Sequence, residues 1–146
     1  LEDIMQDALV LFKDAETYVL RQGMRDLSAA EEFLIRTKLE DFPANKEKAE
    51  GELENLETQV KSHFRRLRKL RRAATLRRVL ISLELALDSI KGLRKKVAKA
   101  DPSDWKKQEA TFQVFQSQCA EELESIRKIF IGIGEELEEA RKELAA

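Results

Sequence analysis

The sequence predicts an all-α protein: an elongated antiparallel three-helix bundle or coiled coil with a kinked first helix and one very long central helix. Three observations lead to this prediction. Charged residues make up 38% of the 146 residues, whereas glycine and proline number only 5 and 2, a composition typical of long helices with charged surfaces. Apolar residues recur in steps of three and four along nearly the whole chain, which is the period of amphipathic helices. No segment alternates strictly between apolar and polar residues, as a half-buried strand would.

The first helix is expected over residues 2–22. Its apolar face follows alternating steps of four and three: Ile4, Ala8, Leu11, Ala15 and Tyr18. Such spacing places side chains on one face of a helix. Gly23 should stop or kink this helix, because glycine is a poor helix former.

A second helix is expected over residues 28–41. Ser28 and Glu31 have the spacing of a capping box, in which a serine and a glutamate satisfy the first backbone amides of a helix. Pro43 should end it near Asp41, because proline disfavours helical geometry in the residue before it.

The central helix is expected over residues 45–99, with Asn45 as its N-cap. A heptad-like apolar stripe continues without glycine or proline from Glu52 to Lys91: Ala49, Leu53, Leu56, Val60, Phe64, Leu67, Leu70, Ala73, Leu76, Leu80, Leu83, Leu87 and Ile90. After Leu70, two successive steps of three, to Ala73 and Leu76, indicate a stammer, a local overwinding of a coiled-coil helix. Unbroken, this helix would be about 80 Å long at about 1.5 Å per residue.

The last helix is expected over residues 103–145, after the helix-stop and helix-start residues 101–104. Its stripe repeats every seven residues: Trp105, Phe112, Cys119, Ile126, Ile133 and Ala140. Trp105 should cover the end of the core. A tight turn near residue 101 would lay this helix antiparallel on the central one, so that residues 61–82 face residues 121–142.

The chain is expected to be one helical domain, residues 1–146, and its start at Leu1 suggests a part of a larger protein. Cys119 is the only cysteine and His63 the only histidine, so neither a disulfide nor a zinc cluster is expected. No metal or other cofactor is expected. The longest uncharged stretches are shorter than the roughly 20 apolar residues of a membrane span. A cytoplasmic protein is therefore expected.

No catalytic site is expected. The antiparallel pairing places His63 and Cys119 about 30 Å apart along the bundle, which excludes a nucleophile and base. Cys119 should behave as a small core residue.

The sharpest candidate site is a basic run on the central helix that contains no acidic residue before Glu84. Its candidate binding residues are Arg65, Arg66, Arg68, Lys69, Arg71, Arg72, Arg77 and Arg78. They could bind an acidic protein or an anionic membrane. They could instead pair internally with glutamates of the last helix and fix its register. Nucleic acid is not expected, because only Phe64 is available there for base stacking.

Two resemblances bear on this pattern. A helical bundle with a basic face resembles the membrane-bending BAR class in its three-helix plan. Residues 27–34 and 50–56 are similar to the middle-helix pattern of spectrin-type repeats, although the first helix lacks the tryptophan usual in that family.

The sequence therefore favours a non-enzymatic protein–protein interaction or scaffold coiled-coil module of a larger cytoskeletal, tethering or signalling protein. Helix faces would bind other proteins, and a homodimer remains open. The alternative is a peripheral membrane-binding, BAR-like module that uses residues 61–78.

Overall fold

The structure is a computed structural model that describes residues 2–70, 73–105 and 108–145. In these ranges the chain forms helices and no strand, which confirms the all-α prediction. The elements in chain order are α1 (Glu2–Thr17), the π-helical turn η1 (Tyr18–Gln22), α2 (Gly23–Leu34), α3 (Phe42–Arg68), α4 (Ala73–Lys99), the 3₁₀ turn η2 (Pro102–Trp105) and α5 (Glu109–Ala145).

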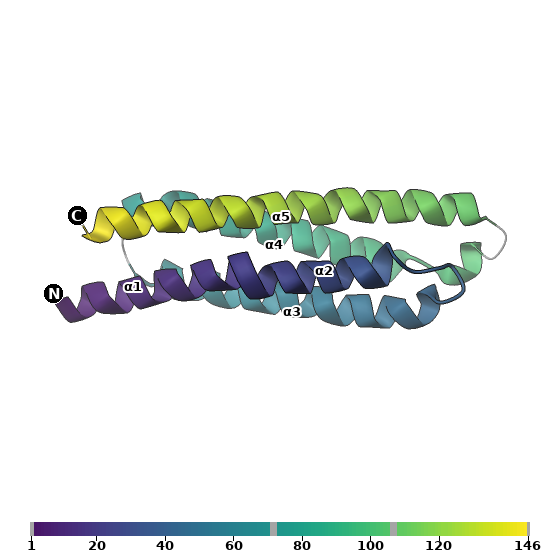
Figure 1. The fold of residues 1–146 in the computed structure, drawn as a ribbon, viewed down its shortest axis with the longest axis horizontal. Coiled ribbons are helices and arrows are strands. Elements are labelled where there is room, and N and C mark those ends of the chain that lie inside the picture. Colours follow the sequence, from purple (N-terminus) through teal and green to yellow (C-terminus); the bar gives the residue numbers. More distant parts are fainter. Residues whose placement is uncertain (1, 71–72, 106–107, 146) are drawn as a thin grey trace.

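The helices form an antiparallel four-helix bundle (Figure 1). Segments α1, η1 and α2 together make one rod, which packs against α3 and α5; α4 packs against α3 and α5 as well. Each helix therefore lies beside two antiparallel neighbours. Both termini and the reversal between α3 and α4 lie at one end of the bundle, here called the hairpin end. The α2–α3 and α4–α5 connections lie at the opposite, loop end.

The prediction of one central helix over residues 45–99 is wrong at its middle, and the bundle has four helices instead of three. The chain is helical on both sides, but it turns at Lys69 and Leu70, where the Leu70 amide donates to the Leu67 carbonyl at 3.1 Å. The two steps of three that suggested a stammer, from Leu70 to Ala73 and Leu76, begin at this turn and continue into α4. A hairpin lets the two apolar stripes bury each other, which a single straight helix cannot do.

The predicted kink at Gly23 is a π-helical turn, and the rod does not stop there. The Gly23 amide donates to the Tyr18 carbonyl, five residues back, and the backbone stays helical. Buried positions Ala15, Val19, Gly23 and Leu27 follow three successive steps of four. These steps exceed 3.6 residues per turn, and a turn closed five residues back takes up the excess. Ser28 is exposed within α2, so it does not start a helix.

The helix boundaries near Pro43 differ from the prediction. Helix α2 ends at Leu34, well before residue 41, and α3 begins at Phe42 with Pro43 in its first turn. Proline is tolerated there because the first helical amides have no partner in the helix. Asn45 is not the N-cap; its side-chain amide donates to the Thr37 hydroxyl at 2.7 Å and ties α3 to the loop.

The core runs along the whole bundle, and the seven-residue stripe of the last helix is buried as predicted. Cys119 is completely buried and Trp105 is 8% exposed at the loop end, where it packs on Phe42 and Phe115. The predicted start at residue 103 is wrong: Pro102–Trp105 form a 3₁₀ turn, Gln108 is not helical, and α5 begins at Glu109. Within those ranges, no helix is both long and apolar enough to cross a membrane.

Candidate functional site: the basic cluster at the hairpin end

The reversal between α3 and α4 gathers the basic run at one end of the bundle. Six of the predicted binding residues form what we call the basic cluster: Arg65, Arg66, Arg68 and Lys69 at the end of α3, and Arg77 and Arg78 near the start of α4. The other two, Arg71 and Arg72, lie outside the described residues. The fold therefore brings the six together around the hairpin end.

All six side chains of the basic cluster are exposed. Among the described residues, none of them lies within 4.0 Å of a carboxylate oxygen. Some cations elsewhere are paired, such as Arg94 with Glu57 at 3.2 Å and Arg141 with Glu16 at 3.3 Å, whereas exposed lysines such as Lys95 are not paired with any described residue. These six cations therefore make no ion pair with a described carboxylate, although the charge of Arg78 does act on Glu136 of α5, where it opposes the rise that burial causes in the pKa of that carboxyl.

The two helix termini at this end have opposite effects on its charge. Arg65, Arg66 and Arg68 occupy the last turn of α3, where cations interact favourably with the negative end of the helix dipole. The first turn of α4 has no acidic residue, so its positive end is left without a compensating carboxylate. Arg77 and Arg78 follow within the next turn. An anion approaching this end meets positive charge from both helices.

The predicted internal pairing between residues 61–82 and 121–142 is not the register that forms. Ser82 donates to Glu136 at 3.0 Å, and Lys96 pairs with Glu122 at 3.1 Å, so α4 is shifted along α5. The α3 part of the basic run packs against the first rod and α4 rather than against α5. The reason is the fourth helix, which takes the place beside α5 that residues 61–70 were expected to fill.

A groove lies between α3 and α4 on the outside of the bundle. Two adjoining hollows share Phe64, Arg68 and Glu84 and together make up this α3–α4 groove. Its lining comprises Lys61, Phe64, Arg65, Arg68, Arg77, Leu80, Ile81, Glu84, Leu87, Asp88 and Lys91. The basic cluster thus borders a partly apolar floor.

A buried polar network between the first rod and α3 was not predicted. Asp26 is 5% exposed and accepts hydrogen bonds from the Tyr18 hydroxyl (3.1 Å), the Gln22 amide (2.9 Å) and the Asn55 amide (3.1 Å). Burial, followed by the charge of Asp26, raises the pKa of Tyr18 far above its ordinary value. The sequence did contain a signal for this network: Asp26 lies beside Leu27 and one turn before Ala30, on the buried stripe of the helix.

The two residues weighed as a nucleophile and base have structural positions. The His63 ring lies 5.2 Å from the Tyr18 ring, and burial first, then Arg66, lowers the His63 pKa. Burial raises the pKa of the Cys119 thiol to about 12, which keeps it protonated and unreactive. No group of three or more metal-ligating side chains was found among the described residues.

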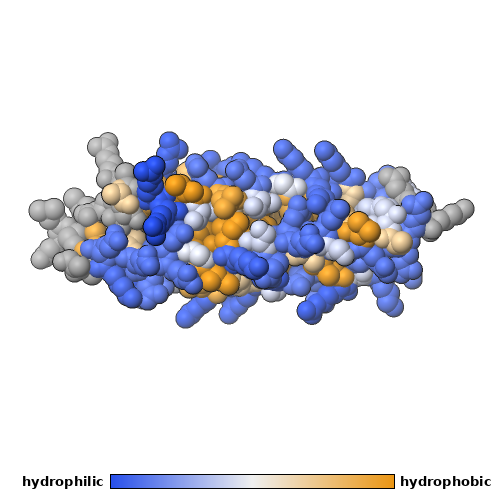
Figure 2. Space-filling model, turned by 90° about the horizontal axis from the view of Figure 1, so that it is seen from above, coloured by the Kyte–Doolittle hydropathy of each residue, from blue (hydrophilic) through white to orange (hydrophobic). Residues whose placement is uncertain are grey.

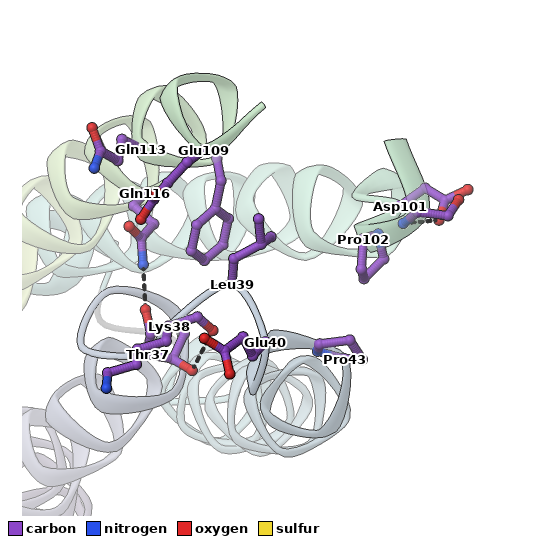
Figure 3. A pocket seen from close by; sticks show the side chains of 12 residues that line it. Thr37, Lys38, Leu39, Glu40, Pro43, Asp101, Pro102, Glu109, Gln113 and Gln116 are labelled. Atoms are coloured by element: carbon purple, nitrogen blue, oxygen red, sulfur yellow. Dashed lines mark hydrogen bonds between the residues drawn. The ribbon is translucent and has the colours of Figure 1, made fainter. Parts of the chain in front are cut away.

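A cleft of about 840 Å³ lies at the loop end, between the α2–α3 loop and the start of α5 (Figure 3). Leu39 and Pro43 face Glu109 and Gln113 across it. The most prominent polar group, the Gln116 side-chain amide, has a structural role. It donates to three carbonyl oxygens at the end of the first rod, those of Leu34, Ile35 and Thr37, at 3.0–3.2 Å. These hydrogen bonds satisfy carbonyl oxygens that have no helical partner beyond the end of α2.

In comparisons with known proteins, no protein family, no curated protein and no solved structure matches the chain.

Proposed function

We propose that this chain is a non-enzymatic interaction module of a scaffold or tethering protein of the cytoplasm, and that its basic cluster docks an acidic protein partner. The observation that carries the proposal is that six exposed cations gather at one end of the bundle, and that none of them has a carboxylate oxygen of the described chain within 4.0 Å. Unpaired like charges destabilise a fold, so a gathered set of them is more readily understood as a binding surface.

The rest of the bundle supports a rigid presenting role. Its helices are packed along their whole length around a continuous core, and the thiol and imidazole that could have served catalysis are held in that core. A rod of this kind holds the basic cluster in a constant geometry, which lowers the entropic cost of docking.

The test uses a fluorescein-labelled oligoglutamate peptide and fluorescence anisotropy. The triple variant Arg65→Gln, Arg68→Gln, Arg77→Gln should bind about ten-fold more weakly than wild type, since each exposed pair contributes about 0.2–1 kcal/mol. Raised salt should weaken wild-type binding, because exposed charges are screened.

The matched control is Lys95→Gln, Lys99→Gln, Lys128→Gln, which removes the same charge from exposed positions outside the cluster. It should bind like wild type. An equal loss in both triple variants would show that only net charge matters, and the proposal would fail.

A peripheral membrane-binding module is the second candidate, and one observation favours it. Ile81 and Leu85, 57% and 53% exposed, follow Arg77 and Arg78 on α4, and Figure 2 shows apolar side chains reaching the surface among charged ones on the side formed by α4 and α5. Basic and apolar residues together are typical of helices that bind membrane interfaces. The chain forms a four-helix bundle, which differs from the three-helix plan of the BAR class. This candidate therefore rests only on the exposed basic and apolar residues of α4.

Vesicles of phosphatidylcholine with phosphatidylserine distinguish the two candidates. If the wild-type protein sediments with these vesicles and the double variant Ile81→Asn, Leu85→Asn does not, the result would support a membrane-binding function. Peptide binding without vesicle binding would reject it.

A further inference from the structure

We propose that the α3–α4 groove binds an acidic amphipathic helix of a partner protein. This inference rests on the proposed function and specifies the partner of the basic cluster. It joins two features that are adjacent in the structure: the unpaired cations and the partly apolar floor between them.

The floor of the groove suits an apolar helix face. Phe64 and Leu80 are half-buried, and Ile81 is 57% exposed, although all three line the same hollow. From Arg77 to Lys91 the groove follows α4 for about 21 Å at 1.5 Å per residue, which matches a helix of about fourteen residues. A helix bound in this way presents side chains at positions i, i+3, i+4 and i+7 to the floor.

The rims select the charge of the partner. Lys61, Arg65 and Arg68 follow steps of four and three along α3, so they line one side of the groove. Arg77 and Lys91 stand at the two ends of the α4 side. Glu84 and Asp88 are the acidic residues of the lining, so cations predominate and a helix with acidic flanks is complementary.

The shape and the charges favour a helix over the other occupants. A second copy of the chain is a poorer occupant, because each long helix described here buries its apolar stripe in its own bundle, and the apolar residues that α5 exposes, Val114 and Ile131, lie far apart along it. A bilayer is planar and anionic, so its lipid head groups would meet Glu84 and Asp88 without filling the floor.

Two labelled peptides of about fourteen residues test the proposal by fluorescence anisotropy. Both contain the same glutamate, leucine and alanine residues; in one the leucines lie on a single helical face, and in the other they are scrambled. Wild type should bind the amphipathic peptide about ten-fold more tightly than the scrambled one. Ile81→Asn should remove most of that difference, because Ile81 is exposed in the free protein and would be buried in the complex.

Leu85→Asn is the matched control, because Leu85 is 53% exposed on the next turn of α4 and does not line the groove. It should leave both affinities unchanged, and an equal effect of Leu85→Asn and Ile81→Asn would overturn the proposal. If wild type binds the two peptides with equal affinity, the proposal that the groove binds an amphipathic helix is overturned, while the proposed function remains intact. Binding to phosphatidylserine vesicles but to neither peptide would overturn both, and so would absence of all binding.

Discussion

A double-mutant cycle on Tyr18 and Asp26 tests how the first rod is held on α3. Both side chains are buried, at 8% and 5% exposure, and the hydroxyl donates to the carboxylate at 3.1 Å. Tyr18→Phe removes this bond while keeping the ring. A hydrogen bond to a charged group contributes about 1.5–3 kcal/mol, so we expect a loss of about 2 kcal/mol in the free energy of unfolding.

The second arm of the cycle is Asp26→Leu, which keeps a similar volume but leaves the buried Tyr18 hydroxyl without its acceptor. An unsatisfied buried donor costs about 1–3 kcal/mol, and the added apolar burial offsets part of this. Gln22 and Asn55 are exposed and can turn to water. In the double mutant no buried partner is orphaned, so we expect stability near that of wild type. Replacing both members of a buried polar pair is often neutral.

Urea unfolding followed by far-UV circular dichroism measures all four proteins, and equal slopes with denaturant confirm that the same surface is exposed on unfolding. The expected result is strong non-additivity, with a coupling energy of about 3 kcal/mol, because the double mutant recovers the losses of both single mutants. A double mutant whose loss equals the sum of the two single losses would refute the network as the link between these residues.

Three further predictions follow from single contacts. Gln116→Ala should destabilise the bundle by about 1–2 kcal/mol and Gln116→Glu by more, because a carboxylate would face three carbonyl oxygens; thermal unfolding measures both. Gly92→Ala should stabilise the protein by about 0.5–1 kcal/mol, because an added Cβ meets nothing within 4 Å. Gly23→Ala should destabilise it, because the added Cβ would lie 2.8 Å from an aromatic ring carbon of α5. A destabilised Gly92→Ala would contradict this account. Burial first, then Asp26, raises the pKa of Glu52 above 4.5, so its contribution to stability is full below pH 4.5 and is lost as pH rises through the raised pKa. Glu52→Gln should therefore stabilise at neutral pH but not below pH 4.5, and a gain independent of pH would contradict it.

The periodicity predicted the buried stripes well, because a buried helix face needs an apolar residue at every third or fourth position. Cys119 and Trp105 occupy the core positions that their spacing indicated. The same pattern could not distinguish a stammer from a turn at Leu70, since both interrupt a heptad by steps of three. It also placed a helix start at Ser28, where a polar residue sits on the exposed side of a continuing helix.

The candidate site was predicted in part. The basic run was identified by its residues, but a single long helix would have spread them along a rod. The turn instead places the ends of α3 and α4 side by side, and the α3–α4 groove exists only because these two helices pack together.

The sequence by itself determined that the chain is helical, most of the residues that form its core, and which residues make up its basic run; Phe64 and Leu80 of the predicted stripe are only half-buried. These properties depend on local spacing and composition. Only the tertiary structure decided that the chain reverses after Leu70, that six cations gather at one end without partners, and that Asp26 is buried against α3. The physical reason is that apolar stripes specify what must be buried but not against which neighbour. That choice is made by the total burial that all the helices achieve together.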